Sequence, residues 1–325
     1  MIAYLIRRLL YLIPVLIGVN LLTFALYFIV NSPEDIARAQ LGGKHIDQSV
    51  VQDWEDQHGY NKPLFYNNKE TGIAALTDTL FVKKSLILFT FNFGVSDSGR
   101  NISHDVSQRM WPSIYIAIPT LIIGLLVNIT FAMLLAFFRQ TYVDLSGVLF
   151  CIIMMSISGL FYIISGQYFI GKVLQLVPIS GFEGGFSAFK FVILPVVVGV
   201  IGGIGAGTRW YRTIFLEEMG KDYIRTARAK GLAESRVLFK HVLKNAMIPI
   251  VTGVVVIIPS LFLGSLIMES FFGIPGLGSY TIDAIRQQDF AIVRAMVFLG
   301  TILYCIGLIM TDIAYTIVDP RVRLQ

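Results

Sequence analysis

Long apolar stretches without charge alternate with short polar connections along most of this chain. The first, Leu9–Val30, has 22 residues and no charged side chain, which is long enough to cross a hydrocarbon core of roughly 30 Å. It is too long for a signal-peptide core and no A-x-A-like cleavage site follows it, so we expect it to be retained. The pattern predicts six membrane-spanning helices: Leu9–Val30, Pro112–Phe138, Ser146–Gly171, Phe191–Gly207, Ala246–Met268 and Ala291–Val318.

Residues 31–111 interrupt this pattern with ten Asp/Glu and eight Lys/Arg. Within them Phe81–Phe93 is apolar in patches, but it contains Lys83 and Lys84 and is too short to span a membrane. We therefore expect a loop or small subdomain on the outer surface. The predicted organisation is a first helix in residues 1–30, this extracytoplasmic loop in 31–111, a core with five spanning helices in 112–318 and a short tail in 319–325.

The longest polar and basic connection within the core is Glu217–Pro249. Counted from Arg209 to Asn245, this region has nine Lys/Arg and four Asp/Glu. Its spacing predicts two short helices around a turn, a helix-turn-helix over residues 212–245. In the first helix, an apolar stripe lies beside a basic stripe. The apolar stripe comprises Leu216, Met219, Tyr223 and Ala227, and the basic stripe comprises Lys221, Arg225 and Arg228.

Gly231 follows the first of these helices, and glycine readily takes the positive φ that commonly ends a helix. Leu232 can then fold back on the last turn. In the second helix, Leu238, Val242 and Ala246 repeat beside basic residues four apart. We expect one face of the hairpin to be buried, by the rest of the chain or by a partner, and the other to be solvated.

Composition places the chain in the membrane. Hydrophobic residues make up 55% of it and charged residues 14%, against about 25% charged in soluble domains. Six spans put both termini on one side, and the basic residues on that side, including Arg7, Arg8 and the hairpin, predict that it is cytoplasmic. The net charge of +5 therefore reflects topology and membrane lipid. The hairpin is tethered between two spans, so we expect no nucleic acid as a partner.

The sequence offers little that could carry covalent chemistry. It has no G-x-x-x-x-G-K-[ST] phosphate loop, so we expect no ATP bound through that motif. Its four histidines, His45, His58, His104 and His241, all lie outside the predicted spans, and Cys151 and Cys305 lie in apolar runs typical of packing residues. We predict no catalytic residue, no metal site and no cofactor in this chain.

The fourth predicted span contains glycines at a spacing of four residues: Gly199, Gly203 and Gly207. Small residues in this register allow close approach of another helix. Packing is the favoured interpretation, and a glycine-lined pathway or hinge is the alternative.

The end of the fifth span combines an acid with a turn-rich motif. Glu269 lies near that end, as Asp312 lies near the end of the sixth span; acids within spans are functional candidates. Their places near the interfaces favour snorkelling or helix pairing instead. The turn that follows contains Pro275, Gly276 and Gly278, and we expect either a connector or an outer-face element that meets a partner.

Several motifs, in order, resemble one family. They are Tyr4-Leu-Ile-Arg-Arg8, Asn92-Phe-Gly94-Val-Ser96, Pro178-Ile-Ser-Gly181, the hairpin from Asp222 to Leu232 with His241, Asn245 and Pro249, then Phe272–Gly278, and Asp319-Pro320-Arg321. Together they resemble the B-type permease of the dipeptide, oligopeptide and nickel group of ABC importers. The resemblance covers nearly the whole chain.

The hairpin departs from the general importer pattern, which is E-A-A-x-x-x-G followed by I-x-L-P. Aligned on Gly231, the glutamate position holds Arg225, the alanine positions hold Thr226 and Ala227, and the final proline position holds Lys244. We interpret these changes as markers of the peptide-permease branch. They argue against any role that needs an acid at position 225.

The resemblance implies an all-α permease of type I importer architecture in the bacterial inner membrane. It implies a homologous second permease subunit, two cytoplasmic ATPases that bind ATP and Mg²⁺, and an extracytoplasmic substrate-binding protein. The ATPase-coupling residues would be Tyr223, Arg225, Thr226, Ala227, Arg228, Gly231, Leu232, His241 and Asn245. Among these, Tyr223, Ala227, Gly231 and Leu232 would fill a cleft on the ATPase.

Three alternatives remain open at this point. The substrate could be nickel or another small solute instead of a peptide. A secondary transporter working without an ATPase would need acids deep in its spans, and only Glu269 and Asp312 are available. A membrane enzyme is disfavoured by the absence of histidine from the predicted spans.

Overall fold

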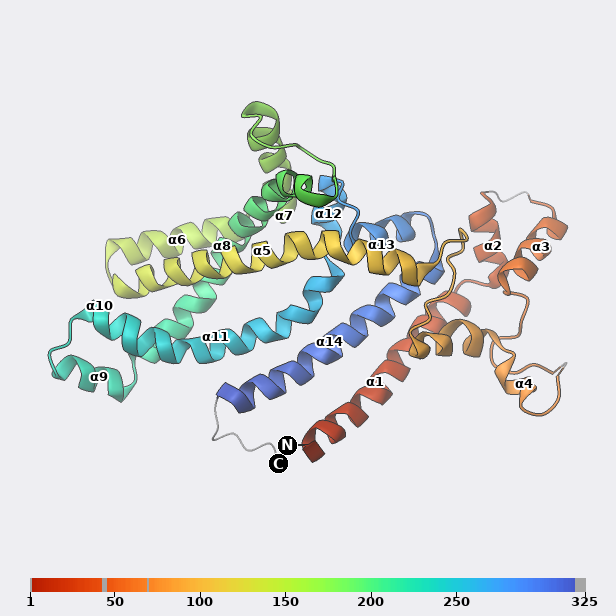
Figure 1. Ribbon diagram of the computed structural model, residues 1–325, viewed down its shortest axis with the longest axis horizontal. Helices are drawn as coiled ribbons and strands as arrows, with labels where there is room; N and C mark the ends of the chain where they lie inside the picture. Colours follow the sequence, from red (N-terminus) through yellow and green to blue (C-terminus); the bar gives the residue numbers. More distant parts are fainter. Residues whose placement is uncertain (1, 43–45, 69, 319–325) are drawn as a thin grey trace. The chain divides into compact units, whose positions relative to one another are not determined.

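The computed structural model describes residues 2–42, 46–68 and 70–318, and over these ranges the chain is helical (Figure 1). Extended pairing in the described part amounts to an isolated bridge between Val95 and Asn101. The all-α prediction is therefore confirmed. Asp319, Pro320, Arg321 and Arg323 lie outside the described residues.

The chain folds as two compact units. One contains residues up to Met110 together with Ser279–Ile309, and the other contains Trp111–Gly278 and the chain from Met310. The long helices α5 and α14 each contribute to both units.

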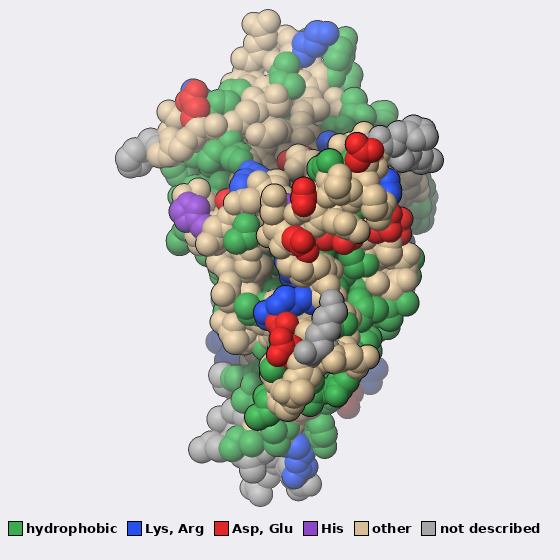
Figure 2. All heavy atoms as spheres, turned by 90° about the vertical axis from the view of Figure 1, so that its right-hand side faces the viewer, with side chains coloured by type: hydrophobic (Ala, Val, Ile, Leu, Met, Phe, Trp, Pro, Cys, Tyr) green, Lys and Arg blue, Asp and Glu red, His purple; other side chains and the backbone are tan. Residues whose placement is uncertain are grey.

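The first unit combines α1 with a set of short helices. Its elements are α1 (Ile2–Phe28), α2 (Pro33–Leu41), α3 (Gln48–His58), α4 (Ala74–Thr77), the π-helix η1 (Phe81–Ser85), the 3₁₀-helix η2 (Leu86–Thr90), α13 (Leu277–Arg286) and much of α14 (Phe290–Val318). Figure 2 shows this side of the molecule, where acidic side chains form one group and a smaller group mixes both charges.

Local sequence explains how the short helices begin and end. Ser32 caps α2 through a reciprocal capping box with Asp35, and Gly42 ends the helix at φ +83°. Gly59 ends α3 at φ +69°. Together α2 and α3 cover the end of α1 with one apolar core, which includes Phe24, Phe28, Ile36, Val51, Trp54, Tyr60 and Leu80.

The second unit contains most of the long helices. Its elements are α5 (Ile102–Phe137), α6 (Tyr142–Ser156), α7 (Gly159–Gly166), η3 (Gln167–Val173), η4 (Gly185–Ser187), α8 (Ala188–Met219), α9 (Asp222–Ala229), α10 (Glu234–Arg236), η5 (Val237–Val242), α11 (Leu243–Ile257), η6 (Ile258–Leu263) and α12 (Leu266–Phe272). In Figure 1, α9 and α10 lie at one end of α8 and α11, and α12 lies at the other.

Over the described residues, five helices are long and apolar enough to cross a membrane, and a bent pair makes up to six. The predicted number therefore agrees with the structure, but α5 begins ten residues before the expected Pro112. Asn101 explains this start, because its Oδ1 accepts the N–H of His104 at 3.1 Å and caps the helix.

The third predicted span, Ser146–Gly171, is a bent pair of helical segments. α6 ends at Ser156 and α7 begins at Gly159, with a bend of 88° between the two helical segments. Ile157 is extended there (φ −87°, ψ 131°). The sequence Ser-Ile-Ser-Gly has low helix propensity, which explains why the break falls at these residues.

The fifth predicted span, Ala246–Met268, also ends differently. The helix stops at Leu263 because Gly264 takes φ +70°, a conformation that L side chains rarely adopt. A separate short helix, α12, then carries Met268 and Glu269.

Candidate functional site

The polar hairpin, residues 220–245, is the most distinctive site that the sequence predicts. Its backbone corrects one expectation: the stripe from Leu216 to Ala227 does not lie on one helix. α8 ends at Met219, Lys221 is extended (ψ 151°), and α9 begins at Asp222. Gly231 then takes φ +74° just after α9, as predicted from its position.

An apolar core lies beneath the hairpin, and the rest of the chain supplies its other half. Ile224 and Ala227 of α9, together with Leu238 and Val242, are buried against Ala132, Met133 and Ala136 of α5 and Phe215 of α8. Leu232 packs partly against the same core, and its N–H donates to the Ala227 carbonyl at 3.4 Å. The predicted apolar face is therefore covered from within.

The opposite face of α9 is solvated. The side chain of Arg225 is 76% exposed and lies 3.4 Å from the Asp222 carboxylate. Thr226 is also exposed, and its hydroxyl donates to the Asp222 carbonyl at 3.0 Å. Across the turn, Arg228 forms a two-point ion pair with Glu234, with Nε 3.0 Å from Oε2. This pair closes the turn around Gly231.

Tyr223 and Asn245 connect α9 to α11. The Tyr223 hydroxyl donates to Glu218 and accepts from Asn245 Nδ2 at 3.1 Å. Asn245 Nδ2 also donates to the His241 carbonyl at 2.8 Å. Burial and the bond to Glu218 raise the pKa of Tyr223 to about 12, so its hydroxyl stays protonated and can keep donating. These residues hold the hairpin together.

An ion pair near the base of the hairpin was missed by the sequence analysis. Arg212 of α8 bonds Asp144 of α6 at two points, 2.9 and 2.8 Å, and Asp144 also accepts the Gln140 N–H at 3.1 Å. Asp144 precedes the predicted span at Ser146, and Arg212 begins the predicted helix-turn-helix, so each was counted among the polar connections. Their separation of 68 residues concealed the pairing.

The three glycines predicted at a spacing of four, Gly199, Gly203 and Gly207, lie on α8, and they differ in how closely other helices approach them. A Cβ on Gly199 would meet Thr120 Cγ2 at 2.9 Å, and one on Gly207 would meet Asn128 Nδ2 at 2.5 Å, so both face α5 closely. A Cβ on Gly203 would meet nothing within 4 Å. The closest backbone approach is instead at Gly205, where a Cβ would lie 2.6 Å from the Cys151 carbonyl oxygen.

The glycine turn, residues 264–278, encloses the carboxylate of Glu269. This side chain is 1% exposed, and its Oε1 accepts the Ser265 N–H at 3.1 Å. The expectation of a snorkelling Glu269 is therefore wrong, because the carboxylate lies inside the turn. A Cβ on Gly276 would lie 2.2 Å from Glu269 Oε2 and 2.5 Å from Ser113 Oγ, so only glycine fits.

The remaining residues of this motif differ in exposure. Pro275 is exposed, whereas Ile274 and Leu277 are buried. The N–H of Leu277 donates to Ser113 Oγ at 2.9 Å. A Cβ on Gly278 would lie 2.6 Å from the Ser265 carbonyl carbon, so the turn folds back against the start of α12.

Within the described ranges, no three His, Cys, Asp or Glu side chains lie together in a way that could hold a metal ion. The hairpin presents exposed guanidinium groups, a solvated helix face and a rigid turn. This arrangement suits docking to another protein.

Comparison with known proteins gives consistent results. Residues 128–324 match the sequence profile described as binding-protein-dependent transport system inner membrane component. The oligopeptide transport system permease protein AppB of Bacillus subtilis is 29% identical, over 99% of this chain and 100% of that protein. The probable peptide ABC transporter permease protein y4tP of Sinorhizobium fredii is 30% identical, over 98% and 99%. The glutathione transport system permease protein GsiC of Escherichia coli is 27% identical, over the full length of both.

Proposed function

The chain belongs to the family of binding-protein-dependent transport system inner membrane components, and we propose that it is a membrane-spanning subunit of an ATP-driven importer of peptides. The observation that carries this proposal is similarity over the full length of permeases named for oligopeptide, peptide and glutathione transport. As a permease subunit, the chain performs transport and no covalent catalysis. ATP is bound by partner ATPases.

The direction of the helices follows from the distribution of basic residues. Arg7, Arg8, Arg139 and the hairpin lie on the side that the positive-inside rule assigns to the cytoplasm. Both termini would then be cytoplasmic, and the segment between α1 and α5 would begin and end on the outer side. The glycine turn, at the opposite end of α11 from the hairpin, would be at the outer face.

The hairpin serves as the docking element for a cytoplasmic ATPase. Arg225, Thr226 and Gly231 are exposed and contact the ATPase directly in this proposal. Ala227 and Leu232 turn toward the chain's own core, so they shape the hairpin instead of filling a cleft on the partner. Tyr223 and Asn245 fix α9 against α11, and the His241 carbonyl orients the Asn245 side chain.

The complete importer contains a homologous second permease subunit, two ATPases and an extracytoplasmic binding protein that delivers the peptide. ATP binding closes the ATPase pair and moves the two hairpins together. The helices then rock between inward-facing and outward-facing states around the substrate path.

The test is purification of the tagged protein from gently solubilised native membranes, followed by mass spectrometry and by transport in reconstituted vesicles. We expect a second permease and P-loop ATPases to co-purify, and uptake of a labelled peptide to require ATP and the binding protein. Uptake by this chain alone, without ATPase, would overturn the proposal in favour of a secondary transporter. Uptake of nickel but no peptide would overturn the substrate class alone.

A further inference from the structure

The segment Phe81–Thr90, which contains η1 and η2, lies beside α1 within the length of the span and is called the wedge here. Asn20 Nδ2 of α1 donates to the Ser85 carbonyl of the wedge at 3.1 Å, and both residues are buried. Asn20 precedes the last residue of α1 by eight positions, which is about 12 Å along a helix. The wedge therefore reaches the depth of the hydrocarbon layer.

Ring contacts on both sides agree with this depth. The ring centres of Phe81 and Phe24 of α1 are 5.1 Å apart. Those of Phe89 and Phe298 are 5.0 Å apart, and Phe298 lies eight residues after the start of α14. Both halves of the wedge are helical, so its backbone groups are largely paired within the segment, as a low-dielectric environment requires.

The end of the wedge nearest the loop is charged. Lys83 and Lys62 both bond the Asp78 carboxylate, and these lysines lower the pKa of Asp78 to about 2. Lys84 Nζ donates to the His58 carbonyl at 2.7 Å and lies 4.6 Å from the centre of the Tyr60 ring. The long lysine stems thus carry their charges away from the apolar end, as at a membrane interface.

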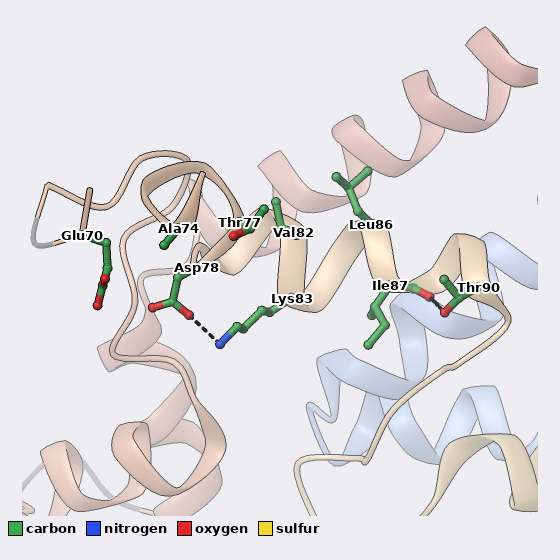
Figure 3. Close-up of a pocket in the computed structure, with 9 residues that line it drawn as sticks. All are labelled: Glu70, Ala74, Thr77, Asp78, Val82, Lys83, Leu86, Ile87 and Thr90. Atoms are coloured by element: carbon green, nitrogen blue, oxygen red, sulfur yellow. Dashed lines mark hydrogen bonds and ion pairs between the residues drawn. The ribbon is translucent and has the colours of Figure 1, made fainter. Parts of the chain in front are cut away.

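A groove of about 770 Å³ runs along the outer surface of the wedge (Figure 3). Glu70, Asp78 and Lys83 line one end of it, and Leu86, Ile87 and Thr90 line the other, with Val82 between them.

We propose that this groove binds a phospholipid of the adjacent leaflet, with the lipid phosphate at Lys83 and an acyl chain along Val82, Leu86 and Ile87. Both charge signs of a zwitterionic lipid are present beside the groove: Lys62 and Lys83 pair with Asp78, and Glu70 lies at the rim. Lys83 remains half exposed and available to phosphate, while Glu70 at the rim faces an ammonium group. Phosphatidylethanolamine has this pair of charges.

The depth of the groove argues for a lipid over a water-soluble protein. Leu86 and Ile87 follow Ser85 directly, and Ser85 is bonded to Asn20 inside the span. A soluble binding protein reaches the loop but not this depth. A lipid held here fixes the wedge to the bilayer beside α1.

The test places a photo-reactive benzoylphenylalanine at Ile87 in the full importer in native membranes, and identifies adducts by mass spectrometry after irradiation. We expect a phosphatidylethanolamine adduct, reduced at least fivefold by Lys83→Glu. Lys83→Gln should give a smaller reduction. Co-purification of the other subunits shows that each variant is folded.

The matched control is the same photo-reactive residue at Leu22, which is 63% exposed on α1 and outside the groove. Lipid adducts there report ordinary surrounding lipid and should not change with Lys83→Glu. A protein adduct at Ile87, no adduct at all, or a lipid adduct that Lys83→Glu leaves unchanged would each overturn the proposal.

Discussion

The polar hairpin and the glycine turn both connect helices, but opposite arrangements stabilise them. The hairpin buries apolar side chains against α5 and α8 and leaves its charges in water. The glycine turn buries a carboxylate, Glu269, inside a shell of glycine and serine. The first can change its surface without changing its fold. In the second, the residues around the carboxylate cannot change without disturbing the packing of the turn.

This difference separates binding from stability. In the hairpin, an exposed residue such as Arg225 can be altered to test docking while the core beneath it stays intact. In the glycine turn, Gly276 and Glu269 are in such close contact that any change in one displaces the other. Four substitutions test the comparison, from the largest expected loss of stability to the smallest.

Gly276→Val should have the largest effect. Its Cβ would lie 2.2 Å from Glu269 Oε2 and 2.5 Å from Ser113 Oγ, and Glu269 is buried, so its carboxylate would be displaced from its hydrogen bond to Ser265. We expect a loss above about 4 kcal/mol and little folded protein, measured as the monodisperse fraction in mild detergent. Gly253→Ala is the control, because a Cβ there meets nothing within 4 Å. Normal recovery of Gly276→Val would show that the turn is not close-packed.

Ala227→Asp places a charge in the hairpin core, where Ala227 is 6% exposed. An unpaired buried charge costs about 3–5 kcal/mol, so α9 should detach and the ATPases should fail to co-purify. Ala229→Asp on the exposed side of the same helix is the matched control and should retain assembly. Uptake at the normal rate by Ala227→Asp would contradict the role of this core.

Glu269→Gln keeps the volume of the side chain but weakens its hydrogen bonds, including the one from the Ser265 N–H. We expect a loss of about 1–3 kcal/mol, seen as a lower midpoint in thermal unfolding of the solubilised complex. Glu183→Gln removes an exposed acid paired with Lys190 and should leave the midpoint unchanged. Equal midpoints for the two variants would remove the distinction between the two regions.

Arg225→Glu should change stability least, within about 0.5 kcal/mol, because the side chain is mostly exposed. Uptake should nevertheless fall strongly if this face docks the ATPase, and Arg225→Lys should restore part of it. The measurement is ATP-dependent peptide uptake alongside the unfolding midpoint. Unchanged uptake would move the docking surface away from α9.

The sequence predicted regions with a simple period and missed those that depend on distant contacts. Leu238, Val242 and Ala246 repeat along one face, and all three are buried as expected. Gly231 has positive φ because glycine at a helix end has a direct physical cause. These features are determined by residues close together in the sequence, so a short stretch of sequence is enough to predict them.

Other features depend on residues far apart. Asp144 and Arg212 pair across 68 positions, and Glu269 is enclosed by Gly264, Gly276 and Ser113. The bend at Ile157 has a local cause in Ser-Ile-Ser-Gly, but these residues lie between apolar runs, so hydropathy alone predicted one span there. The wedge was expected in the outer loop because its lysines concealed how deeply its apolar end reaches.

The contact at Gly205 has a mechanical consequence. The backbones of α6 and α8 touch there, Arg212 and Asp144 bond the same helices near their ends, and Thr208 bonds Asn128 of α5 at 3.2 Å. Sliding of α8 against α5 or α6 would break these hydrogen bonds or force backbone atoms of α6 and α8 together. These three contacts tie the half of α8 nearest the hairpin to α5 and α6, so we expect the three helices to move there as one body.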